Sequence, residues 1–141
     1  MKLTEEQIND ISEDLKLGFT VYINKDTGEM RSIYDMSNLT GVSDLWEDEL
    51  SRIKKNWHNY LEINAIEPWE VFEIMEDFIQ EIVEKNDKPK LHMALKDKRS
   101  FATFRILVDG SDYKQSWITF RKSRYIRYVK EKLRSEGLWE D

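Results

Sequence analysis

Residues 19–34, which read FTVYINKDTGEMRSIY, decide the fold class because they hold two strand patterns joined by a turn. Residues 19–23 are rich in β-branched and aromatic side chains, which are typical of strands. Residues 24–28 have turn chemistry, and Gly28 can adopt a positive φ without steric cost. We therefore predict a β-hairpin whose second strand spans residues 29–34.

The segment before the hairpin is predicted to be helical over residues 5–16. Thr4 is a suitable N-cap, and Gln7 stands three residues later, as a capping box requires. Gly18 is a suitable helix stop. One apolar stripe at helical spacing is made by Ile8, Ile11 and Leu15.

After the hairpin, Ser43 is expected to cap a short helix through Lys55, and residues 59–63 alternate well enough to add a third strand. Residues 68–84 give the strongest helix pattern, because Pro68 stands at the first helical position. The predicted solvated face consists of Glu70, Glu73, Glu76, Asp77, Glu81 and Glu84. The predicted apolar face consists of Val71, Phe72, Met75, Phe78, Ile79, Ile82 and Val83.

The last third of the chain is predicted to be wholly helical. A short helix is expected over residues 89–96, and Ser100 is expected to cap a second that Gly110 ends. Ser111 is expected to cap a long final helix that runs to about residue 136. The sequence thus predicts an α+β fold in a single domain over residues 1–141. A small antiparallel sheet of about three strands near the N-terminus is packed by a mostly helical C-terminal two thirds.

The composition excludes several classes of protein. The 141 residues contain no cysteine, which rules out disulfides, thiolate zinc sites and cysteine nucleophiles. No apolar run approaches the roughly 18 residues of a membrane span, and residues 1–6 lack the apolar core of a signal peptide. We therefore expect a soluble cytoplasmic protein without a membrane partner.

The charges are divided unequally along the chain. Residues 1–87 carry 8 Lys/Arg against 21 Asp/Glu, a net charge of −13. Residues 88–141 carry 14 Lys/Arg against 7 Asp/Glu, a net charge of +7. A division of this size indicates that the basic part either docks on the acidic part or faces an anionic partner. The sequence leaves both interpretations open.

The final helix separates cations from apolar residues when residues 117–134 are placed on a helical wheel. Four cations share one arc, here called the basic arc: Arg124, Arg127, Lys130 and Arg134. The opposite stripe consists of Ile118, Tyr125, Ile126, Val129 and Leu133, extended by Trp117 and Tyr128. The basic arc is a solvated face, a phosphate-binding surface, or a surface that docks on an acidic protein or on this chain's own acidic helix.

Arg121 is the exception, because it lies on the aromatic side of the wheel, between Trp117 and Tyr125. A guanidinium in this position stacks on a ring or pairs with a carboxylate, and we favour a structural role over an anion contact. The candidate binding residues come from the basic third of the chain: Arg105, Trp117, Phe120, Arg121, Arg124, Arg127 and Lys130.

No set of residues has the spacing of a catalytic or metal site. The two histidines, His58 and His92, belong to no metal-ligand spacing, and the chain has no glycine-rich phosphate loop. Residues 26–28 (DTG) resemble the tripeptide of aspartic proteases, but a hairpin turn explains them. Acid pairs such as Glu73 and Asp77 are typical of a solvated helix face. We expect no catalytic residue, no metal and no cofactor.

Several short motifs together resemble a bacterial family of uncharacterised proteins. Residues 22–29 (YINKDTGE) resemble that family's Tyr-Leu-Asp-x-x-Thr-Gly-Glu hairpin. Residues 60–63 (YLEI) and 75–79 (MEDFI) are similar to its middle strand and its Met-x-x-Phe-Ile helix. Its tail motifs are similar to the segments LHMAL at 91–95, FATFR at 101–105 and WITF at 117–120. The resemblance covers about residues 19–139 and implies a shared fold, but no activity.

The chain departs from that family at the turn before Phe101. Relatives have a glycine-rich basic turn there and arginines between the two phenylalanines. This chain has DKRS at residues 97–100, and Ala102 and Thr103 fill the gap. If the turn cradles an anion in relatives, this chain has lost glycine flexibility and two charges there.

Several functions remain open. The leading hypothesis is a non-enzymatic binding or adaptor domain that uses a charged and aromatic surface, with a protein partner favoured over a nucleic acid. The acidic helix at residues 68–84 fits a protein partner, and the basic arc fits a nucleic acid. The alternatives are an enzyme whose site joins Arg105 and Arg121 to carboxylates of that helix, and an acidic inhibitor that covers a basic partner.

Overall fold

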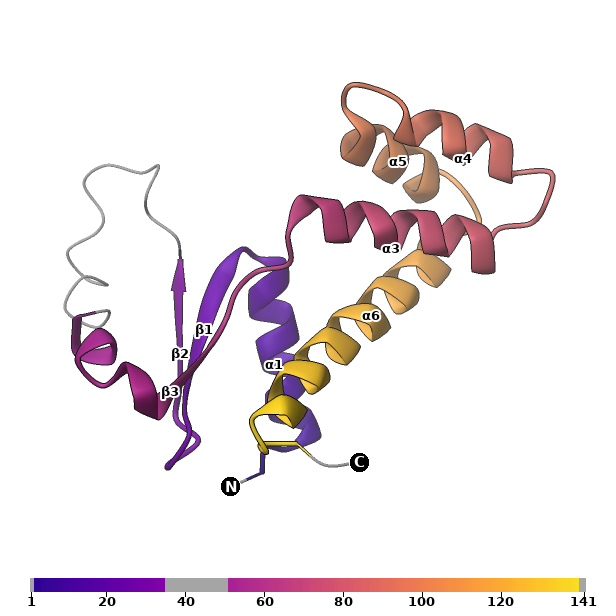
Figure 1. Cartoon of the computed structure of the whole chain (residues 1–141). Helices are drawn as coiled ribbons and strands as arrows, with labels where there is room; N and C mark the ends of the chain where they lie inside the picture. Colours follow the sequence, from indigo (N-terminus) through magenta and orange to yellow (C-terminus); the bar gives the residue numbers. More distant parts are fainter. Residues whose placement is uncertain (1, 35–50, 140–141) are drawn as a thin grey trace. The chain divides into compact units, whose positions relative to one another are not determined.

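The computed structural model describes residues 2–34 and 51–139, and the chain divides into two compact units. The first, here called the sheet unit, comprises Met1–Ile66 and Ile126–Asp141, and the second, the helical unit, comprises Glu67–Tyr125. The division falls inside one long helix, α6 (Lys114–Ser135) (Figure 1). The single domain over residues 1–141 therefore stays a prediction.

The predicted first helix is confirmed as α1 (Glu5–Lys16), with its capping box. Thr4 Oγ1 accepts a 3.1 Å hydrogen bond from the Gln7 backbone N–H, and Gln7 Oε1 accepts a 2.8 Å bond from the Thr4 backbone N–H. These bonds satisfy two donors that the first helical turn leaves unpaired. The predicted apolar stripe is buried, since its residues are at most 2% exposed: Ile8, Ile11 and Leu15.

The predicted hairpin is confirmed as β1 (Phe19–Asn24) and β2 (Met30–Tyr34), and β3 (Tyr60–Ile63) completes a sheet of order β2-β1-β3. Both pairings are antiparallel. Gly28 in the turn has φ +76°, which is the positive φ predicted for it from the sequence. Asn24 Oδ1 closes the turn by accepting hydrogen bonds from the backbone N–H groups of Asp26 and Thr27.

The two faces of the sheet differ. Helix α1 packs against β1, as Figure 1 shows, and the strand residues buried to 1% exposure or less are Val21, Ile23 and Ile63. Tyr22 points to the other face, where it stands opposite Arg31 on β2 and Glu62 on β3. The predicted third strand begins one residue later than expected, because Asn59 belongs to the 3-10 helix η1 (Trp57–Asn59).

The helix expected from Ser43 to Lys55 lies largely outside the described residues. Residues 51–55 are helical, and Ile53 is 3% exposed.

The helical unit contains α3 (Pro68–Glu81), α4 (Lys88–Leu95), α5 (Ser100–Asp109) and the first half of α6. Figure 1 shows α4 and α5 side by side, in agreement with their packing contacts. The core of this unit is centred on Phe78, which is fully buried. Its ring lies 5.2 Å from that of Trp117 and 5.4 Å from that of Phe120, measured between centroids.

Helix α3 ends at Glu81, three residues before its predicted end. The cause is a competing set of hydrogen bonds. The Glu84 backbone N–H donates to the hydroxyl of Tyr113 at 3.1 Å, and the carbonyl of Gln80 accepts from Lys88 Nζ at 3.1 Å. Both groups would otherwise pair with each other in the next helical turn.

Two predicted serine caps are wrong. Ser100 is the first residue of α5, and Arg99 is its N-cap because the Arg99 carbonyl accepts a 2.9 Å bond from Thr103 N–H. Asp97 Oδ1 accepts from the Arg99 backbone N–H, so an aspartate side chain closes that turn. The Ser111 hydroxyl donates to the Val108 carbonyl and accepts from Tyr113 N–H, and α6 begins only at Lys114.

Two apolar residues are more exposed than their predicted positions imply: Ile82 at 44% and Ile118 at 36%. Gly137 ends the last helix as predicted, with φ +73° and a hydrogen bond from Leu138 N–H to the Leu133 carbonyl at 2.8 Å. The α+β prediction is confirmed by the three-stranded sheet and the helices of the two units. Within residues 2–34 and 51–139, no helix combines the length and apolarity needed to cross a bilayer.

Candidate functional site

The aromatic members of the predicted binding set lie in or against the core of the helical unit. Trp117 is 3% exposed, and its ring lies 5.1 Å from that of Phe104. Phe120 is half-buried against Phe78. Trp117 is thus positioned to support the fold, and Phe120 offers a partner only the exposed part of its ring.

Arg124 of the basic arc is held by carboxylates of α3. Its Nη2 donates a 2.5 Å hydrogen bond to Asp77 Oδ2, and its Nη1 lies 3.7 Å from Glu81 Oε2. The guanidinium also lies over the ring of Phe120, at 5.5 Å from its centroid. The Arg124 side chain is only 19% exposed. The acidic helix and the basic helix therefore neutralise each other at this point.

The rest of the basic arc belongs to the sheet unit, where Lys130 is also engaged. Its Nζ lies 3.2 Å from Glu5 Oε1 and 4.7 Å from the centroid of the Trp139 ring. Arg127 and Arg134 are exposed, and Arg134 has a further interaction within the chain. At least two of the basic-arc cations are thus bound to the chain's own carboxylates, Arg124 to the acidic helix α3 and Lys130 to α1, and the contact of Arg124 is the one that the sequence left open.

Arg121 stacks on a ring and does not form an ion pair with any described carboxylate. Its guanidinium carbon lies 5.8 Å from the centroid of Trp117, and its Nε is buried without a hydrogen-bond partner in the described part of the chain. Burial raises the pKa of the neighbouring Tyr125, while the charge of Arg121 lowers it and the charge of Glu70 raises it. Arg121 thus acts on the local electrostatics of the aromatic core.

Arg105 is exposed on α5. Neither Arg105 nor Arg121 is among the residues that line the two described cavities of the helical unit. An enzyme site that joins Arg105 and Arg121 to carboxylates of α3 therefore stays a prediction.

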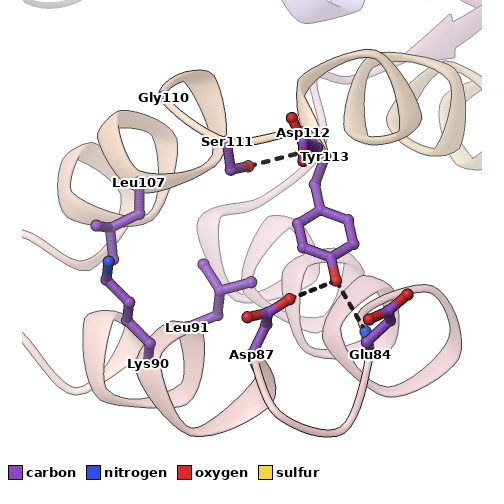
Figure 2. Close-up of a pocket in the computed structure, with 9 residues that line it drawn as sticks. All are labelled: Glu84, Asp87, Lys90, Leu91, Leu107, Gly110, Ser111, Asp112 and Tyr113. Atoms are coloured by element: carbon purple, nitrogen blue, oxygen red, sulfur yellow. Dashed lines mark hydrogen bonds between the residues drawn. The ribbon is translucent and has the colours of Figure 1, made fainter.

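The helical unit instead contains a cleft that the sequence did not predict, with a volume of about 450 Å³. It is here called the acidic cleft, and Figure 2 shows its nine lining residues. They come from the α3–α4 connection, α4, α5 and the α5–α6 connection: Glu84, Asp87, Lys90, Leu91, Leu107, Gly110, Ser111, Asp112 and Tyr113.

Tyr113 fixes one side of the acidic cleft. Its hydroxyl donates a 2.7 Å hydrogen bond to Asp87 Oδ2 and accepts the 3.1 Å bond from Glu84 N–H, as Figure 2 shows. Its ring stands edge-on to Phe78, with centroids 6.4 Å apart. The cleft wall is thereby tied to the aromatic core.

The environment of Tyr113 keeps its phenol protonated. The bond from Glu84 N–H lowers the pKa of Tyr113, but the bond to Asp87, desolvation and the charges of Asp87 and Glu84 together raise it above its usual value. A neutral phenol keeps both hydrogen bonds, because an ionised one has no proton to donate to Asp87.

The lining of the acidic cleft combines carboxylates with apolar side chains. Its charged members are three carboxylates, Glu84, Asp87 and Asp112, and one cation, Lys90, while Leu91 and Leu107 supply apolar surface. No histidine lines the cleft, and the described residues contain no group of carboxylates and histidines suited to a metal ion. The arrangement is suited to a cationic group with an apolar stem, such as a lysine or arginine side chain.

The sequence does not reveal this cleft, because its residues lie in four segments between positions 84 and 113. Ser111, for example, carries only the local signal of a helix cap. The long-range bond from Tyr113 to Asp87 joins them, and no local pattern predicts such a bond.

Comparison with protein families found one that matches almost the whole chain, described as an uncharacterised protein family (UPF0158), over residues 6–139. This confirms the resemblance to a family of uncharacterised proteins that the sequence motifs indicated. Comparison with curated proteins and with solved structures found no match.

Proposed function

Since the chain belongs to the uncharacterised protein family UPF0158, whose description names no activity, we propose a function from its own side chains: it binds another protein without catalysing a reaction. The acidic cleft of the helical unit is the proposed binding site, and a lysine or arginine side chain of the partner is the proposed occupant. The supporting observation is the lining, which includes three carboxylates, one lysine and two leucines.

The proposed contact has an apolar and an ionic part. The methylene stem of the partner's side chain would cover the half-buried Leu107 and the small exposed part of Leu91, and its charged head would lie near Glu84 and Asp112. These two carboxylates have no ion-pair partner in the described part of the chain, so they are available to a cation. Exposed pairs of this kind are each worth about 0.2–1 kcal/mol, which is typical of a reversible contact.

Exposed apolar side chains on the same helices support a protein as the partner. Met93 on α4 is 67% exposed, and Ile106 on α5 is 71% exposed. One or two positions along a helix turn the side chain by about 100–200°, so Met93 and Ile106 lie on other sides of these helices than the cleft residues Leu91 and Leu107, and they would contact a partner beyond the cleft itself. Methionine is enriched in protein interfaces, and exposed apolar side chains are typical of them.

The experiment measures the affinity of two fluorescent peptides by anisotropy. One carries a central arginine between leucines, and the other has glutamine in place of that arginine. We expect the arginine peptide to bind at least about fivefold more tightly. Glu84→Gln and Asp112→Asn should each weaken it about two- to fivefold, because each removes one carboxylate charge.

Glu76→Gln is the matched control, because Glu76 is exposed on α3, lies outside the cleft and undergoes the same change of charge. It should leave the affinity unchanged. Equal affinity of the two peptides, or equal effects of Glu84→Gln and Glu76→Gln, would contradict the proposed site.

A nucleic acid is a second candidate partner, and one observation favours it. Residues 88–109, which span α4 and α5, carry 6 Lys/Arg against 2 Asp/Glu, and none of these cations forms an ion pair within the described residues. Binding of duplex DNA at about 50 mM salt, weakened by Lys98→Glu with a smaller salt slope, would support this candidate. An equal loss of DNA affinity after charge reversal at Arg127 would instead place the DNA contact on the basic arc.

A further inference from the structure

The sheet unit has a second cavity, of about 440 Å³, on the face of the sheet opposite α1. It is here called the aromatic cavity. Its lining residues come from β1, β3, η1 and residues 53–54: Tyr22, Ile53, Lys54, Trp57, Tyr60 and Glu62. Three of the six are aromatic, and none belongs to the helical unit.

Strand register places two of these aromatics and the carboxylate on one face. Tyr22 stands opposite Glu62, and Tyr60 lies two residues before Glu62 on β3. Side chains two residues apart on a strand share a face, so Tyr22, Tyr60 and Glu62 are neighbours. Trp57 enters from η1, directly before the strand.

Trp57 leaves much of its indole open to a ligand. It is 72% exposed, although a tryptophan side chain carries one of the largest apolar surfaces of any residue. Ile53, at 3% exposure, closes the cavity from the inside. Aromatic rings that line an open cavity attract cations, because the quadrupole of the π system makes the electrostatic potential above the ring face negative.

Glu62 supplies the negative charge of this cavity. It is exposed and has no ion-pair partner among the described residues. The described residues of the sheet unit carry 11 Lys/Arg against 10 Asp/Glu, so they are nearly neutral, and a cation in the cavity would be attracted by Glu62 itself.

Lys54 is the one cation among the described residues of the lining, and its ammonium makes no described contact with a ring. The cation–ring contacts within the described residues involve Arg121, Arg124, Lys130 and Lys132, and none involves Lys54. A primary ammonium is strongly hydrated, whereas a trimethylammonium group is larger and sheds water more easily. The trimethylammonium group therefore suits a cavity that offers a cation aromatic ring faces and few hydrogen-bond acceptors.

We propose that the aromatic cavity binds a trimethylammonium group, with Trp57 and Tyr60 supplying ring faces and Glu62 supplying the negative charge. The group belongs either to a free quaternary amine such as choline or to a trimethylated lysine of a protein. This site shares no described residue with the acidic cleft, so its test is independent of the function proposed for that cleft.

The test compares choline with its neutral isostere 3,3-dimethylbutan-1-ol, in which carbon replaces the charged nitrogen. The signal is the chemical shift of the Trp57 indole N–H in the full chain. Choline should bind at least about fivefold more tightly than the alcohol, because only the cation gains from the ring faces. Equal affinities would overturn the proposal, since they would leave apolar burial as the only contribution.

Charge variants distinguish a cation site from an anion site, because removal of the same charge changes the affinity in opposite directions in the two cases. Glu62→Gln should weaken choline binding about twofold, and Lys54→Gln should strengthen it by a similar factor. Weaker binding after Lys54→Gln would overturn the proposal. Both side chains are exposed, so neither variant depends on refolding of the core.

Aromatic variants locate the site. Trp57→Leu should abolish choline binding. Because this variant lacks the indole signal, its binding is monitored by the chemical shift of a tyrosine or a methyl group of the cavity. Trp69→Leu, which changes a tryptophan 63% exposed on α3, should not affect binding. Unchanged binding after Trp57→Leu would overturn the assignment. A peptide that carries trimethyllysine distinguishes the two sources, because tighter binding than choline assigns the group to a protein and weaker binding assigns it to a small molecule.

Discussion

Arg124 on α6 donates a 2.5 Å hydrogen bond to Asp77 on α3, so the basic and acidic segments of the helical unit neutralise each other in part. The charge division along the sequence is therefore reduced in three dimensions. A positive face read from a helical wheel overstates the charge that a partner meets, because Arg124 is engaged inside its own unit.

Arg124→Ala should lower the free energy of unfolding by about 1 kcal/mol, measured by urea denaturation. The value is modest because Asp77 is 43% exposed and water screens the pair. A double-mutant cycle with Asp77→Asn isolates the ionic part from the packing of Arg124 on Phe120. Arg127→Ala, on the exposed side of the same helix, should change stability by less than about 0.5 kcal/mol. A coupling energy of zero would show that the pair contributes nothing.

Phe78→Ala should lower the free energy of unfolding by about 3–5 kcal/mol, because it leaves a cavity at the centre of the aromatic core. Near-ultraviolet circular dichroism should lose the signal of packed aromatic rings. Trp69→Ala on the same helix is the control, since Trp69 is 63% exposed and its loss should cost about 0.5 kcal/mol. Similar losses for the two variants would mean that Phe78 is not the packing centre.

Ser12→Ala should leave stability unchanged or raise it by up to about 1 kcal/mol. Ser12 is fully buried on α1, and its hydroxyl has no hydrogen-bond partner within the described residues. Alanine removes the desolvated hydroxyl and has the higher helix propensity. A loss of more than about 1 kcal/mol would reveal a hydrogen bond to that hydroxyl.

Alkaline pH should destabilise the chain through Tyr125. Burial raises the pKa of Tyr125 in the folded state, so the folded chain holds this proton at a pH where the unfolded chain has lost it. The stabilisation is complete below the usual tyrosine pKa of about 10 and is lost as pH rises through the raised value.

Tyr125→Phe should therefore flatten the fall in unfolding free energy between about pH 9 and pH 11. The ultraviolet absorbance of tyrosinate is measured against pH for both chains. The part of the absorbance that is absent in the variant should appear in the wild-type chain at a pH above the usual tyrosine pKa. Titration of that part at or below the usual tyrosine value would contradict the burial argument.

Much of the fold could be predicted from local patterns because its elements carry their own signals. The capping box of Thr4 and Gln7 and the turn at Gly28 are encoded within a few residues, and both are present in the structure. Errors arose where a distant group competed for a local bond. Helix α3 ends early because Tyr113, 29 positions from Glu84, takes the Glu84 N–H.

The candidate sites were harder to predict for the same reason. The sequence singled out Trp117 as a binding residue because it stands in a basic and aromatic segment, whereas the structure buries it against Phe104. The acidic cleft depends on Tyr113 and Asp87 meeting, and the aromatic cavity depends on Tyr22 pairing with Glu62. Pairings between segments carry no periodicity that one sequence reveals.

The most direct test of the proposed function is a chemical-shift map of the isotope-labelled full chain titrated with the arginine peptide. The account predicts that the largest amide shifts occur at residues around the acidic cleft, at Glu84, Leu91, Leu107 and Ser111, and that the glutamine peptide produces much smaller ones. Shifts spread evenly over the chain, or centred on Arg127 and Arg134, would contradict a binding site in the acidic cleft.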